Sequence, residues 1–547
     1  MMRVLPGVTR KTVGRELLAG VTLLAIAVPL NIGYAQIAGL PATAGLYALI
    51  LPGIVYALVA STRQMVASPD AAAAALVASS LGGLAVAGGG DYLQLALAQA
   101  IIGGVLFGLC ALFRLGFLAN FLSEPILIGF VGGLALDILV SQTAKMLGVK
   151  IDSGAEFVEK VEALVTGLPT ANLWSIVIAA LAVLILVGGR KLARRVPWAL
   201  IVLIGSTIAV VVAGLEQLGV SVLGPVQAGP PTLTWPAIGL DKWLQVTPSA
   251  VALTLVAMAE GLLVARRYAQ KNGYTTNPNR DLLAFGAANV AAGVSGGFTI
   301  GSSTSRTAAL DQIGSRTQLP TIVAAVGTLL LVLFGTALLE EIPSPAIGAI
   351  VAVAVVPLLG IRDFARLWRE SKFEFAVGAV CFLGAIFLGP IWGILLAFVL
   401  SLLNLARRAA NPPIDVLHQV GGPATPVHDA PADAQSVVIV RFAAPLFFAN
   451  SATFVDAITH ATREASARGL VHVVLDCEAI TDIDVTGAAS FREVVSSLRE
   501  RGIQLHVSRM RSHLKRQFAE LDLLDGVSSF TTNHEAFEAL QGVGRAN

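Results

Sequence analysis

The sequence is poor in charged residues for its length. Its 547 residues are 55% hydrophobic and only 13% charged, whereas soluble proteins average about 25% charged residues. This shortage excludes an ordinary soluble chain and predicts a protein with many membrane-spanning segments. The formal net charge of +2 also lacks the basic excess of a nucleic-acid-binding protein, so no nucleic-acid partner is expected.

Histidine is missing from the hydrophobic part of the chain, and cysteine is rare throughout. All seven histidines follow residue 410, so a proton relay inside the membrane would have to use carboxylates. The three cysteines, Cys110, Cys381 and Cys477, show neither disulfide nor metal-ligand spacing. No nucleophile–base pair, metal set or phosphate loop is present, so we expect no enzyme, no metal and no cofactor.

Hydrophobic runs of about 20 residues predict spanning helices. We expect fourteen segments, two of them short: 16–37, 42–60, 70–87, 92–113, 117–141, 172–189, 197–216, 248–267, 281–294, 303–312, 319–339, 344–360, 373–389 and 390–407. An even number places both termini on one side of the membrane. Clusters of Arg and Lys near residues 190, 266, 362 and 407 fall on that side, which predicts cytoplasmic termini in a plasma-membrane protein.

Two of the hydrophobic segments are interrupted. Residues 61–72 and 296–307 each predict an extended stretch that turns into a half-helix. They are third in their respective blocks of seven, as two inverted repeats would require, and such paired broken segments indicate a transporter's binding site. Each half-helix N-terminus carries about +0.5 charge. Two of them facing each other predict an anion site.

The second interrupted segment holds the densest polar cluster of the membrane part, Ser302 to Arg306. Hydroxyls, backbone N–H groups and a fixed positive charge suit an oxyanion. The alternative is a helix cap with Arg306 reaching toward the cytoplasm.

Two carboxylates accompany this cluster, and both are expected to take part in coupling. Asp70 precedes the first half-helix and can both cap it and bind a proton beside the substrate. Glu260 lies within segment 248–267, too deep for a solvated charge, and either couples transport to protons or forms a structural ion pair with Arg306. Protonation of these carboxylates would leave the site positive. A third carboxylate, Asp137, is interpreted as a structural hydrogen-bonding residue between helices, with a role in coupling as the alternative.

The chain changes character near residue 410. We expect a transport domain at 1–410, a linker rich in Pro, Gly and Ala at 411–436, and a soluble α/β domain at 437–547. Strands are expected at 437–442, 472–477 and 504–508, and helices at 450–468, 486–501, 511–522 and 533–541.

Several long motifs in order carry a family resemblance. They are Pro29 to Tyr47, Ser61 to Ala72, Gly296 to Ala308 and Arg441 to Asn450. The chain resembles the SulP anion permeases (sulfate permease/solute carrier 26 family), which carry a C-terminal cytoplasmic STAS domain. The resemblance implies an α-helical polytopic fold of two inverted seven-segment repeats, like that of nucleobase permeases. It also implies homodimers in the bilayer and a regulatory or dimerisation role for the STAS domain.

The resemblance also implies a substrate site between the third and tenth segments, beside the first and eighth. The substrate-binding residues expected there are Leu30, Asn31, Tyr34, Asp70, Ala71, Ser302, Ser303, Ser305 and Arg306, with Glu260 for coupling. Many sulfate-type members carry Gln where this chain has Leu30, and Leu is similar to bicarbonate and dicarboxylate members. In the STAS domain, Val485 stands where related domains are phosphorylated on Ser.

Together these features predict a secondary active transporter of small inorganic anions, namely proton-coupled sulfate uptake by alternating access. Two alternatives stay open: a bicarbonate or C4-dicarboxylate transporter, and an uncoupled anion channel. Arg306 and the STAS domain argue against a nucleobase permease, because a neutral base needs no cation.

Overall fold

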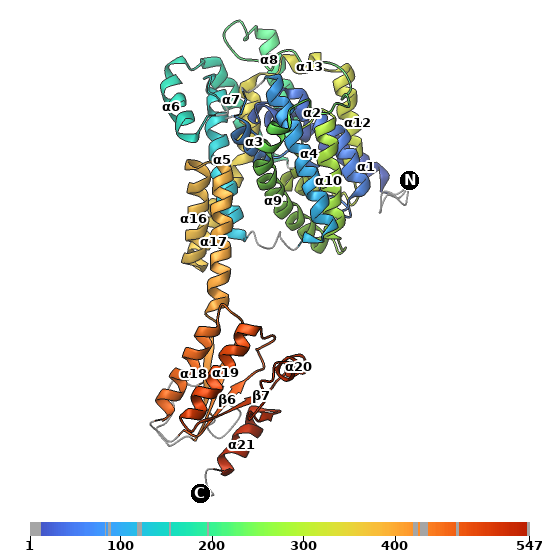
Figure 1. Ribbon diagram of the computed structural model, residues 1–547. Coiled ribbons are helices and arrows are strands. Elements are labelled where there is room, and N and C mark those ends of the chain that lie inside the picture. The colour runs from blue at the N-terminus through green and yellow to red at the C-terminus, as the bar shows by residue number, and fades with distance from the viewer. Residues whose placement is uncertain are drawn as a thin grey trace. The chain divides into compact units, whose positions relative to one another are not determined.

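Two compact units make up the chain, residues 1–401 and 402–547 (Figure 1). The computed structural model describes residues 12–543, except 83, 86–88, 117–122, 153–154, 194–195, 419–424, 427–435 and 467–469.

The first unit is helical. Its helices are α1 (Val13–Ile37), α2 (Ala42–Val59), α3 (Ala71–Leu81), α4 (Gly90–Leu112), α5 (Glu124–Leu147), α6 (Phe157–Gly167), α7 (Leu173–Leu192), α8 (Trp198–Ala213), α9 (Leu240–Lys271), α10 (Pro278–Val294), α11 (Thr304–Ile313), α12 (Leu319–Phe334), α13 (Ala337–Glu340), α14 (Ser344–Val355), α15 (Ile361–Glu370), α16 (Lys372–Phe387) and α17 (Pro390–Ala410). Each of the fourteen predicted segments has a helix. Helices α6 and α15 lie outside the prediction, and the predicted segment 319–339 is divided between α12 and α13.

Length and hydropathy separate these helices into two groups. Among the described residues, six helical stretches are long and apolar enough to cross a membrane, and the bent pair of α6 and α7 would make seven. Helices α3, α8 and α12 are apolar but shorter. The fourteen predicted segments are consistent with this helical membrane-type fold, and their number as full spans stays a prediction.

Close backbone contact between small residues holds the helices of the first unit together. A Cβ added at Gly104 of α4 would lie 2.7 Å from the carbonyl oxygen of Gly286 in α10, and a Cβ at Gly286 would lie 2.8 Å from the carbonyl oxygen of Gly104. Lipid supplies no hydrophobic drive for helix association, so contacts between small residues replace it.

The two interrupted segments meet each other. Short strands β1 (Ala67–Ser68) and β2 (Gly301–Ser302) pair antiparallel, with Ala67 opposite Ser302 and Ser68 opposite Gly301. Helix α3 follows β1, and α11 follows β2. The chain therefore breaks twice at one place, and the exposed backbone groups of one break satisfy those of the other, as membrane-embedded irregular backbone requires.

The second unit is a six-stranded sheet with helices on both faces. Its strands are β3 (Ile414–His418), β4 (Thr425–Pro426), β5 (Val437–Phe442), β6 (His472–Asp476), β7 (Gln504–Ser508) and β8 (Ser529–Phe530), in the order β4-β3-β5-β6-β7-β8. Helices α18 (Ser451–Ser466), α19 (Val485–Glu500) and α20 (Ser512–Glu520) share the larger core with one face. Helix α21 (Asn533–Val543) packs on the other face.

Part of the expected linker is not a linker. Residues 414–418 form β3, which pairs antiparallel with β5 from Ile414 opposite Phe442 to Leu417 opposite Ile439. The flanking Pro and Gly residues indicate a break, but β3 becomes a strand because β5 offers it a free edge. The rest of the expected linker lies largely outside the described residues.

Two buried histidines face each other in this sheet. Nδ1 of His472 in β6 lies 3.1 Å from Nε2 of His506 in β7, and both side chains are buried. Burial lowers the pKa of both imidazoles. The pKa of His506 falls to about 4, because the neighbouring His472 adds to the effect of burial.

This pair predicts that the second unit loses stability in acid. A histidine whose folded pKa lies below its unfolded value near 6.5 contributes fully above that pH, and the contribution is lost as the pH falls toward 4. The free energy of unfolding of the second unit would fall by on the order of 3 kcal/mol. We expect faster amide exchange in β6 and β7 at pH 5 than at pH 7, after correction for intrinsic rates.

In His506→Gln this pH dependence should shrink, whereas the surface variant His534→Gln should keep it. Equal protection of β6 and β7 at both pH values in the wild type would contradict the interpretation.

Candidate functional site

The N-termini of helices α3 and α11 form the centre of the site. Asp70 caps α3, where its Oδ1 accepts a hydrogen bond of 2.8 Å from the backbone N–H of Ala73. Ser303 caps α11 by accepting from the backbone N–H of Arg306. The backbone N–H of Ser303 donates to the carbonyl of Val66 at 2.9 Å, which ties the two segments together. Two partial positive charges thus lie beside one another.

Arg306 is buried at this place, with only 1% of its surface exposed. Its Nε donates to Ser303 Oγ at 2.7 Å, and its Nη2 donates to the carbonyl oxygen of Pro69. Its Nη1 has no hydrogen-bond partner, and among the described residues no carboxylate oxygen lies within 4 Å. The alternative in which Arg306 reaches out to the cytoplasm is therefore wrong. The guanidinium keeps an unused donor inside the protein, and the charge of Asp70, which is beyond ion-pair distance, acts on it.

Helix α1 supplies an apolar and aromatic wall. The Tyr34 ring centroid lies 5.8 Å from the guanidinium carbon of Arg306. Leu30, one turn earlier, is buried, and α1 contacts both α3 and α11. The Nδ2 of Asn31 donates to the carbonyl of Ala27, while its buried Oδ1 has no partner.

Three further predicted residues lie on the two broken segments. Ala71 and Ser302 are buried, and Ser302 Oγ has no hydrogen-bond partner. Ser305 is exposed at the N-terminus of α11, so this terminus borders open space. The buried hydroxyls of Ser68 and Thr299 also lack partners. The site therefore holds several donors that the protein leaves unused.

Glu260 reaches the same region from α9. Asp70 Oδ2 lies 2.5 Å from the position that a Cβ on Gly301 would take, and Ala257 Cβ lies 3.8 Å from it. Glu260 follows Ala257 by one helical turn on the same face, and its charge and that of Asp70 interact. Glu260 is half-buried and forms no ion pair with Arg306, so the structural ion-pair alternative is wrong.

Side chains that the sequence analysis did not single out hold the broken segments in place. Asp281 of α10 accepts from the backbone N–H groups of Ser61 and Thr62 at 2.7 and 3.1 Å. Asn289 bonds both the N–H and the carbonyl of Ile300. Asp281 and Asn289 are polar residues within the apolar segment 281–294. A polar residue in such a segment is the sequence feature that could have identified them as structural partners.

Three more such hydrogen bonds reach the backbone of the first broken segment, one from Thr307 of the second segment and two from Gln318 before α12. Thr307 Oγ1 accepts from the backbone N–H of Val66, and the Gln318 amide donates to the carbonyls of Thr62 and Met65. The local sequence does not predict these hydrogen bonds, because they join residues more than 200 positions apart.

Asp137 has the structural role expected of it. Its Oδ2 lies 2.8 Å from Nζ of Lys160, a buried residue of α6, so the pair ties α6 to α5. Asp137 is therefore neutralised by an ion pair, whereas Arg306 and Glu260 form no ion pair within 4 Å among the described residues.

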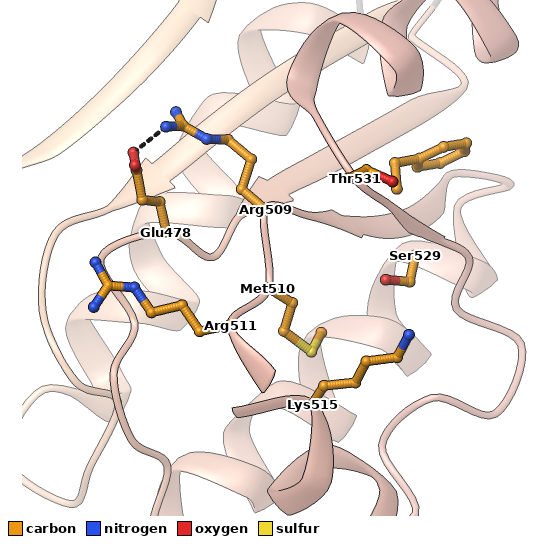
Figure 2. Close-up of a pocket in the computed structure, with 8 residues that line it drawn as sticks. Glu478, Arg509, Met510, Arg511, Lys515, Ser529 and Thr531 are labelled. Atoms are coloured by element: carbon orange, nitrogen blue, oxygen red, sulfur yellow. Dashed lines mark ion pairs between the residues drawn. The ribbon is translucent and has the colours of Figure 1, made fainter. Parts of the chain in front are cut away.

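The second unit contains a separate recess of about 400 Å³ (Figure 2). Arg509, Arg511 and Lys515 line it together with Glu478, and Figure 2 shows the Arg509 guanidinium turned to the Glu478 carboxylate, 2.5 Å away. All its lining residues belong to the second unit, so the recess is no part of the site on α3 and α11.

Comparison with known proteins identifies the family of the chain. The model of the sulfate permease family matches residues 14–381, and that of the STAS domain matches residues 431–536. A probable sulfate transporter of Mycobacterium tuberculosis is 33% identical over 525 residues, which cover 95% of this chain and 93% of that protein.

Two solved structures share the fold. Murine Solute Carrier 26 family member A9, an anion transporter in the inward-facing state, superposes with a TM-score of 0.89 at 22% identity, covering 98% of this chain and 92% of that one. The transmembrane domain of a cyanobacterial bicarbonate transporter, BicA, reaches a TM-score of 0.61 at 22% identity, covering 72% of this chain and 98% of that one.

The contact between Gly301 and Asp70 gives a steric test of the site. In Gly301→Ala the new Cβ would fall 2.5 Å from Asp70 Oδ2, so the carboxylate must rotate out of its cap, which costs about 1 kcal/mol. We expect anion binding to weaken, measured by calorimetry on the purified protein. Gly53→Ala, whose Cβ would meet only Thr321 at 3.5 Å, is the matched control. Equal affinity in both variants would contradict this arrangement.

Proposed function

We propose that this chain, which belongs to the sulfate permease family and carries a STAS domain, takes up sulfate together with protons by alternating access. It is a multi-pass membrane protein and an anion transporter, not an enzyme. Sulfate as the anion, the proton as the coupling ion and alternating access as the mechanism are the proposed properties.

The unpaired guanidinium of Arg306 is the observation that carries the proposal. A buried charge without a partner is costly, and protein charges in membranes are normally paired. Arg306 has Ser303 and Pro69 as hydrogen-bond partners but no carboxylate. A dianionic substrate between the two helix N-termini would supply the missing charge and accept the free Nη1 donor. The hydroxyl of Ser302 and the N–H group of Ala71 suit the remaining sulfate oxygens.

The carboxylates Asp70 and Glu260 support coupling to protons. Two half-helix ends and Arg306 together contribute about +2, which two ionised carboxylates would cancel. Protonation of one or both restores the positive site, so the anion and the proton favour each other's binding. Glu260 has no cation partner among the described residues, which leaves its proton free to exchange.

The choice of sulfate follows the named relatives, and Leu30 is the feature that opposes it. Leu30 is buried one turn from Tyr34 on α1, where an apolar side chain offers no hydrogen bond to a fourth sulfate oxygen. Bicarbonate, with fewer oxygens, is therefore the second candidate. We also propose a plasma-membrane location with both termini in the cytoplasm, and a homodimer.

Proteoliposomes test the coupling. We expect labelled sulfate uptake to rise when the outside is made acidic, and we expect Glu260→Gln to lose this dependence, because a glutamine cannot release a proton. Asp137→Asn, which alters a carboxylate already paired with Lys160, should keep the dependence if it folds. Wild-type uptake that ignores the proton gradient would disprove symport. If bicarbonate or fumarate inhibits sulfate uptake and is itself taken up while sulfate is not, the substrate would be reassigned to that anion.

Arg306 can be tested independently of coupling. Arg306→Gln removes the charge and should weaken sulfate binding by about 2 kcal/mol or more, roughly thirtyfold, at every pH. Arg306→Lys keeps the charge and should retain part of the affinity. The measurement is equilibrium sulfate binding to the purified protein. Undiminished binding to a folded Arg306→Gln variant would place the anion elsewhere.

A further inference from the structure

We propose that α15 is an interfacial helix that binds anionic lipid headgroups through Arg362 and Arg369. This inference concerns a surface of the first unit distant in sequence from α3 and α11, and it does not depend on which anion is carried.

The position of α15 in the chain indicates how deep it lies in the membrane. It follows α14 and a short 3-10 turn, Val356–Leu359, and precedes α16. Helix α14, the 3-10 turn and α15 together form one stretch, Ser344–Glu370, that is long and apolar enough to cross a membrane, and α15 with its charged residues is the end of this stretch at a membrane surface. Gly360, which has φ of +64°, makes the turn between α14 and α15. Helix α15 itself is strongly amphipathic, in contrast to the uniformly apolar helices around it.

One side of α15 is fixed by contacts within the protein. Leu367 is buried, and the ring of Phe364 packs edge-on against Phe375 and Phe382 of α16, with centroids 6.1 and 5.8 Å apart. The Arg366 guanidinium lies 2.5 Å from the carboxylate of Glu124 at the start of α5. These contacts determine which residues of α15 face outward.

The outward residues of α15 follow a fixed order around the helix axis: apolar, then basic, then acidic. At 3.6 residues per turn, Ile361, Ala365 and Trp368 share one edge, and Ile361 and Trp368 are 72% and 52% exposed. Arg362 and Arg369 come next around the helix. The acidic residues Asp363 and Glu370 lie farthest from the apolar edge. Positive charge therefore borders the exposed apolar edge, and negative charge faces away from it.

This order fits a bilayer containing anionic lipid better than it fits water. An interfacial helix buries its apolar edge at the boundary of the acyl chains, with basic residues at headgroup level. Trp368 is of the residue type enriched at that depth, and Nζ of Lys372 lies 3.3 Å from its ring centroid. Arg362 and Arg369 are exposed and form no ion pair with any described residue. Phosphate groups of the lipid would be their partners.

Lipid binding to the full-length protein tests the proposal. The purified protein would be equilibrated with phosphatidylglycerol or phosphatidylcholine, and retained lipid would be counted by native mass spectrometry. We expect the wild type to prefer phosphatidylglycerol. The double variant Arg362→Gln/Arg369→Gln should lose this preference roughly tenfold or more, whereas Arg362→Lys/Arg369→Lys should keep most of it.

Glu370→Gln is the matched control on the far edge of the same helix, and it should leave the preference intact. Because all these positions are exposed, the variants should fold, and their melting temperatures in phosphatidylcholine nanodiscs verify this. An undiminished preference in the folded glutamine variant, or no preference in the wild type, would overturn the proposal. Sulfate transport is not the readout, so failure here would leave the proposed function standing.

Discussion

The antiparallel pairing of β1 with β2 is the constraint on which the rest of the first unit depends. Two polypeptide breaks inside an apolar unit would each leave backbone N–H and carbonyl groups unsatisfied, at a cost of several kcal/mol for each group. The two breaks satisfy one another at Ala67–Ser302 and Ser68–Gly301. The same pairing places the N-termini of α3 and α11 side by side. Stability and the positive field of the proposed anion site therefore arise from one set of contacts.

Charge at this junction is left unbalanced. Asp281 and Asp137 are engaged by backbone N–H groups or by a lysine, whereas Arg306 and Glu260 form no ion pair within 4 Å among the described residues. Desolvation makes such an arrangement unfavourable unless a mobile ion completes it. A transport site has this property, because a charge that the protein itself neutralised would not need its cargo. Asp70 caps α3, and its charge acts on both Arg306 and Glu260.

Polar residues of α10 and the N-cap residue of α12 brace this junction. Asp281, Asn289 and Gln318 bond the backbone of the broken segments, so the positions of Asp70 and Arg306 do not rely on two short strands alone. The second unit forms its own core around β5, β6 and β7. Its buried pair of His472 and His506 has no counterpart in the first unit, whose sequence contains no histidine.

The sequence alone determined the membrane class, the order of the apolar helices, the two interrupted segments and the residue types of the candidate site. These features follow from local hydropathy, helix capping and motif order, as Asp70 and Ser303 illustrate. Only the tertiary structure decided that Arg306 has no carboxylate partner, that Glu260 lies near Asp70 rather than bonding Arg306, and that residues 414–418 form a strand. Each of these depends on contacts between residues distant in the chain, on which local hydropathy carries no information. The unpaired state of Arg306 is decided by the pairing of β1 with β2, which brings the Pro69 carbonyl to a guanidinium 237 residues away.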